Sequence, residues 1–325
     1  MSNTIISIII PTKNRAHLIE NCIHSLCKQN FDINKFEIIL VDNNSTDNTR
    51  KIVEELQNNN NCKIKYLFEE KSGSHFARNN AAKIAKGEFL YFTDDDLIAD
   101  PNMLSEILKT FDFHPDLASV TGRILPNWET QPPKWIYKYC NNYLLSLNDR
   151  HEEIIIDSKD VGIFSCHQMI KKDIFIKAGG FNPDIVNGEW IGDNETGLHK
   201  KIKKLGYKFG YNRNSTTYHQ IPTSRITQSY LNNRFANQGN CDSYSDYREF
   251  NYEKEKLIAI NREFKIKIIK GVLRYLIHRL TLSDKWHIRR AQINYFINRI
   301  KYNKKLINDK TFRKMVLINN WIDGS

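Results

Sequence analysis

The sequence lacks the cysteine patterns that mark zinc-binding and disulfide-rich secreted proteins. Its 325 residues include only six cysteines, and these form neither a Cys-x-x-Cys pair nor a closely spaced ladder: Cys22, Cys27, Cys62, Cys140, Cys166 and Cys241. A zinc ribbon normally shows paired cysteines, and a small secreted scaffold shows many at short spacings. The spacing therefore argues against both classes and fits a protein of the reducing cytosol.

Long apolar runs are missing as well. The first apolar stretch, IISIII at residues 5–10, is too short for the core of a signal peptide and runs directly into Pro11 and charged residues. No later stretch approaches the roughly 20 apolar residues of a membrane-spanning helix, and the chain has no internal repeat or low-complexity tract. We therefore expect a cytoplasmic protein without an export signal or a spanning helix.

The composition is that of a folded soluble protein with an excess of positive charge. Hydrophobic residues make up 40% of the chain and charged residues 26%, and the length suits one large domain with an appended segment. Lysine and arginine outnumber aspartate and glutamate by 48 to 37, which gives a formal net charge of +11. Such an excess indicates an anionic partner, for which nucleotide phosphates, nucleic acid and acidic lipid all qualify.

Residues 5 to about 125 alternate short apolar runs with helical patterns. The apolar runs that resemble strands are IISIII, FEIILV, KIKYLF and EFLYFT, and ASVTGRI is a candidate fifth. Between them apolar residues recur at helical spacing, as Leu18, Cys22 and Leu26 do after the first run. This order predicts an α/β fold with a mostly parallel sheet covered by helices on both faces.

The remainder of the chain is irregular at first and then helical. Residues 126–190 include the proline- and tryptophan-rich stretch PNWETQPPKW, and we expect a long loop over the site there. A helix over about 193–205, ended by Gly206, and a strand at YKFGYN follow. From about residue 226 onward the chain is expected to be helical and basic.

Three consecutive carboxylates, Asp94, Asp95 and Asp96, follow the apolar run EFLYFT. In parallel sheets, ligands bind beyond the carboxyl ends of strands, where these residues are expected to lie. Two carboxylates about 4 Å apart repel by roughly 4 kcal/mol at an effective dielectric constant of 20, so a fixed cluster normally holds a cation or a proton. The next helix already has its cap in Asp100 and Pro101, which leaves the triplet without that duty. The cluster therefore predicts a Mg²⁺ or Mn²⁺ site, and a merely solvated turn is the alternative.

Several motifs in this order resemble glycosyltransferase family 2. They are SIIIPTKNR, EIILVDNNSTDNT, HFARNNAAKIAKGEFLYFTDDDLIADPNML and GGFNPD, and they match over residues 5–125 and more loosely to about 240. The resemblance implies the GT-A fold, a Rossmann-like, mostly parallel sheet flanked by helices. It also implies a catalytic domain over 1–225, with a nucleotide-binding half to about 125 and an acceptor-binding half from about 126, followed by a basic helical region over 226–325.

By this resemblance the triplet is the family's Asp-x-Asp element, with Asp95 in the middle position. Asp96 would face the metal, and Asp94 would contribute to the same site and lie nearer the ribose of a nucleotide-sugar donor. A metal held there bridges the two phosphates of the donor and neutralises the charge of the departing diphosphate. His219, which follows the last strand, would be a further ligand of metal or phosphate, although a lone histidine often has only a structural role.

The same resemblance assigns residues from four segments to the donor pocket. They are Pro11, Thr12, Asn14, Arg15, Asp42, Asn44, Arg78, Asp94 and Asp95. Asp42 would accept a hydrogen bond from the nucleobase, but it could instead form an Asx turn before the helix expected at 46–57. Arg78 would face the base or the diphosphate, and for both Arg15 and Arg78 a solvated surface position is the alternative.

The acceptor side needs a carboxylate that takes the proton of the attacking hydroxyl. Family members present it in a G-E-D-x-x-L stretch, to which DNETGLHKKIKKLGYK corresponds here, with Glu195 in place of the usual Asp. This departure leaves Glu195 and Asp193 as the two candidates. We favour Glu195, because its longer side chain can compensate for a shifted helix start. Both acids could instead only complement the positive end of the helix.

Three further residues are assigned to the acceptor or phosphate side by the resemblance. Gly180, beside Gly179, permits close approach of the backbone. Trp190 would stack on a sugar face or lie in the core, and Arg225 would contact the diphosphate or remain a surface charge.

The basic tail contains the amphipathic stretch IKIIKGVLRYLIHRL, in which Ile268, Val272, Tyr275 and Leu276 share one face. Such a helix can lie on an anionic membrane, dock on the catalytic domain or pair with another subunit in a homo-oligomer. The first of these would place the protein at the inner face of the cell membrane. No nucleic-acid recognition module is present, so we do not expect nucleic acid as a partner.

Together these features predict a metal-dependent, inverting glycosyltransferase. It would move a sugar from a nucleoside diphosphate sugar, with a UDP-sugar as the preferred donor, to a hydroxyl of a glycan or lipid-linked acceptor in surface polysaccharide biosynthesis. A nucleotidyltransferase is the enzymatic alternative, but it would normally carry a glycine-rich basic loop where this chain has PTKNRAH. An inactive scaffold that acts through its basic helices is the other alternative, and the retained acids at 94–96 and 193–195 argue against it.

Overall fold

The computed structural model describes residues 4–140, 145–157, 161–186 and 188–323. Its strands are β1 (Ile6–Thr12), β2 (Phe36–Asp42), β3 (Ile64–Phe68), β4 (Phe89–Thr93), β5 (Leu97–Ala99), β6 (Leu117–Trp128), β7 (Ile154–Asp157), β8 (His167–Lys171), β9 (Ile185–Val186), β10 (Glu189–Trp190) and β11 (Lys208–Ile221). Its helices are α1 (Ala16–Cys27), α2 (Thr49–Asn59), α3 (Ser74–Ile84), α4 (Met103–Phe113), α5 (Lys134–Tyr139), α7 (Lys172–Lys177), α8 (Asn194–Lys204), α9 (Gln228–Phe250), α10 (Lys254–Leu280), α11 (Lys285–Asn308) and α12 (Lys310–Val316).

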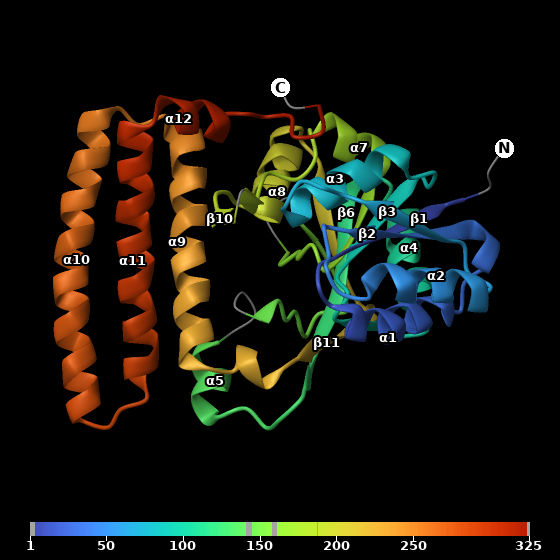
Figure 1. Ribbon diagram of the computed structural model, residues 1–325, viewed down its shortest axis with the longest axis horizontal. Helices are drawn as coiled ribbons and strands as arrows, with labels where there is room; N and C mark the ends of the chain where they lie inside the picture. The colour runs from blue at the N-terminus through green and yellow to red at the C-terminus, as the bar shows by residue number, and fades with distance from the viewer. Residues whose placement is uncertain (1–3, 141–144, 158–160, 187, 324–325) are drawn as a thin grey trace.

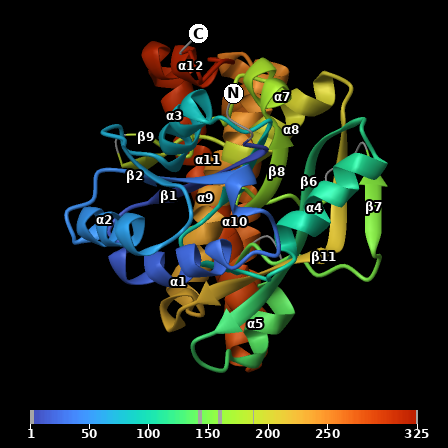
Figure 2. The same ribbon diagram turned by 90° about the vertical axis from the view of Figure 1, so that its right-hand side faces the viewer.

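A central sheet carries helices on both faces, and α9, α10 and α11 stand side by side as a separate layer (Figure 1). The sheet order is β3-β2-β1-β4-β8-β6-β11-β5, with β7 paired to β11 at one edge (Figure 2). Neighbouring pairs among β1 to β4 are parallel, as are β6 and β11, whereas β8, β5 and β7 pair antiparallel with their neighbours. The expected α/β fold with a mostly parallel, helix-covered sheet is confirmed.

Strand β1 is buried on both of its faces. Ile8 and Ile10 belong to a hydrophobic cluster that includes residues of α1, α2 and α4, whereas Ile9 belongs to a second cluster with residues of α3, α7 and α8. Successive side chains of a strand point to opposite faces of the sheet, so helices on both sides require apolar residues at every position. This is why the strand is encoded by an unbroken apolar run.

The expectation of a long loop over 126–190 is wrong. This segment contains the end of β6, α5, β7 and also β8, which lies inside the sheet between β4 and β6. Strand β8 begins with two polar residues that are fully buried, His167 and Gln168. The ring of His167 is 2.8 Å from the Tyr91 hydroxyl, and Gln168 donates to Ser119 Oγ at 3.0 Å. These hydrogen bonds compensate for the burial of the polar groups. Because β8 begins with polar residues, the pattern of apolar residues in the sequence did not predict this strand.

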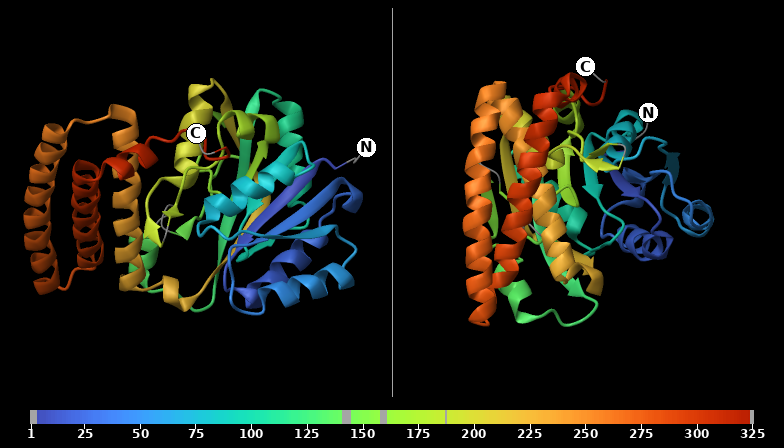
Figure 3. Two further views of the ribbon diagram at one scale, coloured as in Figure 1. Left: turned by 45° about the horizontal axis from the view of Figure 1, so that its top comes forward. Right: turned by 60° about the vertical axis from the view of Figure 1, so that its left-hand side comes forward.

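The C-terminal region packs against the sheet domain. After α12 the chain runs back to the body of the molecule (Figure 3), where Trp321 N–H donates to the Gly179 carbonyl at 2.9 Å and Ile322 joins a core cluster of the sheet domain. The expected division at residue 225 therefore separates segments that pack together. Among the helices of the described ranges, none is both long and apolar enough to cross a bilayer.

One cysteine pair was not anticipated from the sequence spacing. Cys27 at the end of α1 and Cys62 just before β3 form a disulfide with a Cα–Cα distance of 5.8 Å. Cys22, Cys140 and Cys166 are free and buried, and burial raises the pKa of each thiol. These three cysteines therefore act as small apolar residues of the interior.

Candidate active site

A cavity of about 520 Å³ lies where the loops after β1 and β4 meet the start of α8 and the middle of α9. The residues expected from the sequence that line it are Pro11, Thr12, Arg15, Arg78, Asp94, Asp95, Asp96, Trp190, Asp193, Glu195 and Arg225. Five other expected residues do not belong to its lining: Asn14, Asp42, Asn44, Gly180 and His219. The carboxyl ends of parallel strands thus bring together side chains that are up to about two hundred positions apart, as the fold class requires.

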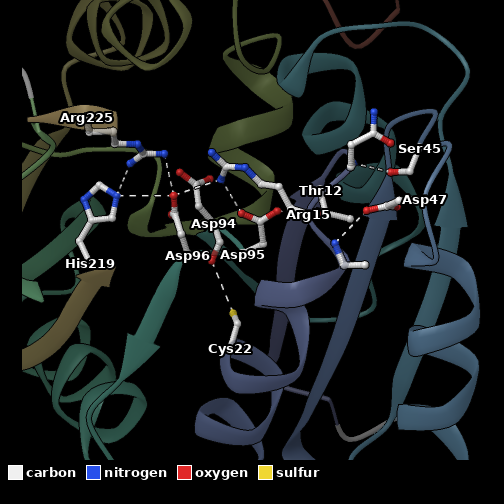
Figure 4. A network of polar contacts seen from close by, with 12 residues as sticks. Thr12, Arg15, Cys22, Ser45, Asp47, Asp94, Asp95, Asp96, His219 and Arg225 are labelled. Atoms are coloured by element: carbon white, nitrogen blue, oxygen red, sulfur yellow. Dashed lines mark hydrogen bonds and ion pairs between the residues drawn. The ribbon is translucent and has the colours of Figure 1, made fainter. Parts of the chain in front are cut away.

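Asp96 is a buried carboxylate surrounded by positive or hydrogen-bonding groups. Its Oδ2 atom accepts from Arg225 at 2.8 Å and from Arg15 at 3.1 Å, and it lies 3.6 Å from His219 Nε2 (Figure 4). Burial opposes ionisation, but His219, Arg225 and Arg15 outweigh it and hold the pKa of Asp96 well below its usual range. The carboxylate is therefore ionised at neutral pH.

Asp95 has a different environment from its neighbour. It accepts a hydrogen bond from the Thr12 hydroxyl at 2.7 Å and another from Arg15 at 2.7 Å. Burial outweighs the attraction to Arg15 and raises the pKa of Asp95 to about 6. Both oxygens are committed to β1 and its following loop, so Asp95 fixes the position of the triplet relative to Arg15.

Asp94 is held by a chain of polar contacts whose members Arg78, Ser74 and Asp184 also line the cavity. Arg78 of α3 donates to Asp94 at 2.6 Å and to Ser74 Oγ at 2.7 Å, and Ser74 donates to Asp184 at 2.6 Å. His75 Nδ1 lies 2.7 Å from the other oxygen of Asp184. Arg78 is only 3% exposed, so the alternative of a solvated surface arginine is wrong.

The hydrogen bonds of His219 indicate which of its two ring nitrogens carries the proton. Its Nδ1 is 2.8 Å from the Leu145 carbonyl, which can only accept, so Nδ1 carries the proton in the neutral ring. In this tautomer the lone pair of Nε2 accepts from Arg225 at 2.6 Å, and Nε2 lies 3.6 Å from Asp96 Oδ2. His219 therefore lies next to Asp96, although it is not one of the residues that line the cavity.

The residues present fit a divalent cation whose coordination shell is completed by the substrate. Within the described parts of the chain, no group of three or more His, Cys, Asp or Glu side chains is arranged to hold a metal ion alone. Asp96 Oδ1, however, is buried without a hydrogen-bond partner among the described residues, and His219 Nε2 lies close to the same carboxylate. Mg²⁺ in nucleotide sites often takes only one or two carboxylates and receives its other ligands from water and substrate phosphates.

The loops after β1 and β2 are tied together at the edge of the cavity. Asn14, in the left-handed region with φ of 54°, accepts from Thr46 N–H at 2.7 Å, and Asn44 also has a positive φ of 64°. Asp42 accepts from Ser45 N–H at 2.8 Å, which is the Asx turn considered above, and from the Tyr66 hydroxyl at 2.7 Å. The turn geometry is therefore present, and contact of Asp42 with a nucleobase stays a prediction.

Asp193 and Glu195 differ in what their carboxylates contact. Asp193 is buried, and its two oxygens accept from Asn182 at 2.8 Å and from Ser245 at 2.5 Å. Glu195 is half-buried in the cavity wall and forms no hydrogen bond or ion pair with another described side chain. Burial raises the pKa of both carboxyl groups, although the charges of Arg78 and Arg234 oppose the shift at Glu195.

Two residues expected on the acceptor side have separate positions. The half-buried Trp190 lines the cavity and donates its indole N–H to the Gly192 carbonyl at 3.1 Å. Gly180 lies behind the wall with φ of 68°, and a Cβ there would stand 2.6 Å from Asn79 Oδ1. The close approach expected at Gly180 is therefore made to protein atoms of α3.

Helix α9 supplies a wall that the sequence analysis missed. The cavity is lined by six of its residues: Arg234, Asn237, Gln238, Cys241, Asp242 and Ser245. The sequence of α9 is rich in Asn, Ser, Gln and Asp, residue types that suit the polar wall of a cavity. That polar composition is the sequence signal for this wall.

The fold and the site can be set against known proteins. Residues 7–179 match the family model described as glycosyl transferase family 2. The chain belongs to this family. The GT-A fold expected from the sequence motifs agrees with this membership, and the glycosyl transferase model covers β1 to β4 together with the Asp94–Asp96 element.

Curated relatives share part of the chain. The Staphylococcus aureus poly(ribitol-phosphate) beta-N-acetylglucosaminyltransferase TarS is 32% identical over 164 residues, which make up 48% of this chain and 29% of that protein. The Campylobacter jejuni GalNAc(5)-diNAcBac-PP-undecaprenol beta-1,3-glucosyltransferase is 42% identical over 107 residues, 32% of each protein. The matched segments thus span about a third or less of the length of these relatives.

Solved structures resemble the chain over almost its whole length. The Pyrobaculum calidifontis mannosyltransferase PcManGT, in complex with GDP-Man and Mn²⁺, covers 98% of this chain and 85% of its own with a TM-score of 0.56 and 17% identity. S. aureus TarS 1-349 in complex with UDP-GlcNAc covers 93% of this chain and 92% of its own, with a TM-score of 0.50 and 17% identity. At this level of identity the likeness shows a shared fold.

Proposed function

We propose that the protein transfers a sugar from a nucleoside diphosphate sugar to an acceptor hydroxyl, with inversion at the anomeric carbon. The observation that carries this proposal is a contrast within one cavity. Three carboxylates are bound by arginines, whereas Glu195 accepts no hydrogen bond from another described side chain. An inverting transfer needs both a positively charged site for the leaving diphosphate and a separate base for the acceptor.

The donor side is assigned to the strand-end wall. Asp96 and His219 would hold a divalent cation, Mg²⁺ or Mn²⁺, which when bound supplies positive charge to the donor diphosphate. Arg15 and Arg225 line the cavity beside Asp96 and would pair with phosphate oxygens, because guanidinium groups match them in geometry. Arg78 holds Asp94 in place for the ribose, since its two contacts fix the carboxylate from α3.

Glu195 is assigned the role of general base. Its carboxylate is free to accept a proton from the acceptor hydroxyl, whereas both oxygens of Asp193 are occupied by Asn182 and Ser245. A raised pKa makes the carboxylate of Glu195 a better proton acceptor than an exposed glutamate. Trp190, beside it in the cavity wall, would stack on the face of a sugar.

The substrates are proposed from chemistry and from the relatives. UDP-sugar is the preferred donor, although the related structures hold UDP-GlcNAc in one case and GDP-Man in the other. A glycan or lipid-linked acceptor in surface polysaccharide synthesis is consistent with relatives that are named for a poly(ribitol-phosphate) and for an undecaprenol-linked acceptor.

A nucleotide-binding panel tests the proposal. The thermal unfolding of the purified chain is measured with UDP, GDP, CDP and TDP, each with Mn²⁺, with Mg²⁺ and with a chelator, and release of the diphosphate from the matching sugar nucleotide is then followed. A ligand at about 100 times its dissociation constant adds roughly 2.7 kcal/mol to the free energy of unfolding. We expect one nucleotide to stabilise the protein in a metal-dependent way and its sugar to be turned over. Stabilisation by nucleoside triphosphates with release of pyrophosphate would favour a nucleotidyltransferase, and no stabilisation at all would favour the inactive scaffold.

A further inference from the structure

The second half of α10 is left uncovered by the rest of the molecule. The buried residues of this helix are Leu257, Asn261 and Phe264, and none of its residues from 265 to 280, all of which the structure describes, is buried. Six large apolar side chains in that half are between 49% and 85% exposed: Ile266, Ile269, Leu273, Leu276, Ile277 and Leu280. A continuous exposed surface made of several large apolar side chains marks an interaction site in most soluble proteins.

These side chains form one continuous stripe, which we call the α10 outer face. Positions 266, 269, 273, 276 and 280 alternate steps of three and four residues, and such positions lie one above another on a helix. The opposite side faces α11, because Tyr275 approaches Trp286 with 6.3 Å between ring centroids, and a Cβ on Gly271 would lie 3.2 Å from Ile293. In Figures 1 and 3, α10 is the outermost helix of its layer. Of the face expected from the sequence, Val272 and Leu276 are exposed, whereas Ile268 and Tyr275 turn toward the bundle.

The charge beside the α10 outer face has a single sign. Residues 265–282 contain five cationic side chains and no aspartate or glutamate: Lys265, Lys267, Lys270, Arg274 and Arg279. Lys267, Lys270 and Arg274 also line a groove of about 840 Å³ between α10, α11 and α9, together with Arg289 and several aromatic rings. Among the residues that the structure describes, no aspartate or glutamate lines this groove. The surface therefore suits an occupant that is both apolar and anionic.

A second copy of the chain does not meet this description. Pairing two α10 outer faces would bury the apolar stripe but would bring Lys270 and Arg279, which flank it, close to the same cations of the other copy. An anionic bilayer offers acyl chains for the stripe and phosphates for the flanking cations. We propose that the α10 outer face binds the headgroup region of an anionic lipid bilayer, with Lys270 and Arg274 paired to lipid phosphates.

The position of the groove connects this docking to the catalytic cavity. Gln238 of α9 lines both the groove and the cavity that contains Glu195. The groove therefore leads from α10 toward the acceptor side of the cavity, and a lipid-linked acceptor would reach the site along it. This extension rests on the proposed function, whereas the docking itself does not. The expected cytoplasmic location, at the inner face of the cell membrane, stays a prediction.

Vesicle flotation with the full chain tests the docking. The protein is mixed with vesicles of phosphatidylcholine alone or with vesicles that also contain about 30% phosphatidylglycerol, which gives them an anionic surface. We expect flotation with the anionic vesicles, at least tenfold weaker flotation with the neutral ones, and release at high salt because the attraction is partly electrostatic. Equal binding to both kinds of vesicle, or binding to neither, would overturn the proposal.

Matched variants show whether α10 is responsible. We expect the double variants Leu273→Ser/Leu276→Ser and Lys270→Glu/Arg274→Glu each to lose at least tenfold in vesicle binding. The controls are Phe113→Ser, which removes a 76% exposed apolar side chain on α4, and Lys203→Glu/Lys204→Glu, which reverses two exposed charges on α8. Controls that lose as much binding as the α10 variants would contradict the assignment.

Two further readouts separate the alternatives. Nucleotide binding without vesicles is measured for every variant, so a misfolded protein is recognised and a failure of the proposed function is distinguished from a failure of docking. Light scattering during gel filtration gives the oligomeric state. A dimer that dissociates in Leu273→Ser/Leu276→Ser, in a protein that does not float, would assign the α10 outer face to self-association and overturn the lipid proposal.

Discussion

On the strand-end wall of the cavity, Asp94, Asp95 and Asp96 each accept a hydrogen bond from an arginine, whereas Glu195 on the α8 wall accepts none from another described side chain. Both walls are partly withdrawn from water. On the first wall Arg78, Arg15 and Arg225 surround the triplet. The pKa of Asp96 is lowered despite its burial, whereas burial raises the pKa of Asp95, the middle residue, to about 6. On the second wall burial raises the pKa of Glu195.

The difference separates two chemical tasks that acidic residues perform. A carboxylate that is held ionised by fixed cations cannot readily take a proton, but it can bind a metal ion and orient a charged substrate. A carboxylate whose ionised form is disfavoured has a higher affinity for a proton and suits general-base catalysis. Under the proposed function, binding takes place at the strand ends and proton transfer at the start of α8.

Replacing Glu195 by Gln should have the largest effect. The amide keeps the size of the side chain but cannot accept the hydroxyl proton, so we expect transfer to fall by about 10²- to 10⁴-fold. Donor affinity, measured by calorimetry, should change by less than about threefold because Glu195 lies on the other wall. A variant that turns over normally would show that the two walls do not divide the work in this way.

The metal dependence of donor binding tests the first wall. In Asp96→Ala we expect the gain in nucleotide affinity that Mn²⁺ provides to fall by about 100-fold, which is about 2.7 kcal/mol. Binding measured in a chelator should be retained, because Arg15 and Arg225 remain and lose a competing carboxylate. The control is Asp112→Ala, an exposed carboxylate on α4. If Mn²⁺ strengthens binding to Asp96→Ala as much as to the unaltered protein, the cation is held elsewhere.

The pH dependence of transfer tests the second wall. Burial raises the pKa of Glu195 above the ordinary value of about 4.3, and only its ionised form can take a proton. Activity should therefore fall about tenfold per pH unit below the raised pKa, and the fall should begin at a higher pH than for an exposed glutamate. The profile of kcat should keep this acid limb in Asp96→Asn and lose it in Glu195→Gln. An acid limb that persists in Glu195→Gln would assign the titration to another group.

The sequence predicted the first wall better than the second, for a physical reason. The triplet and Thr12 follow strands whose apolar runs are local signals, and the register of a parallel sheet then brings them together. The choice between Glu195 and Asp193 depended on Asn182 and on Ser245, which is 52 residues away from Asp193. Such contacts arise from packing between segments that are distant in the sequence. The spacing of the acidic residues along the chain does not show which carboxylate is hydrogen-bonded.

Asp193 should show the smallest effect on transfer and a measurable effect on stability. In Asp193→Asn the side chain keeps its shape and one acceptor oxygen, but it loses the charge that strengthens the hydrogen bonds from Ser245 and Asn182. We expect the free energy of unfolding to fall by about 1 to 3 kcal/mol, and transfer measured well below the melting temperature to change by less than about threefold. In the double variant with Ser245→Ala the two losses should not be additive, because both remove the same contact between α8 and α9. A loss of transfer as large as that of Glu195→Gln, with unchanged stability, would instead make Asp193 the base and remove the distinction between a structural and a catalytic acid at the start of α8.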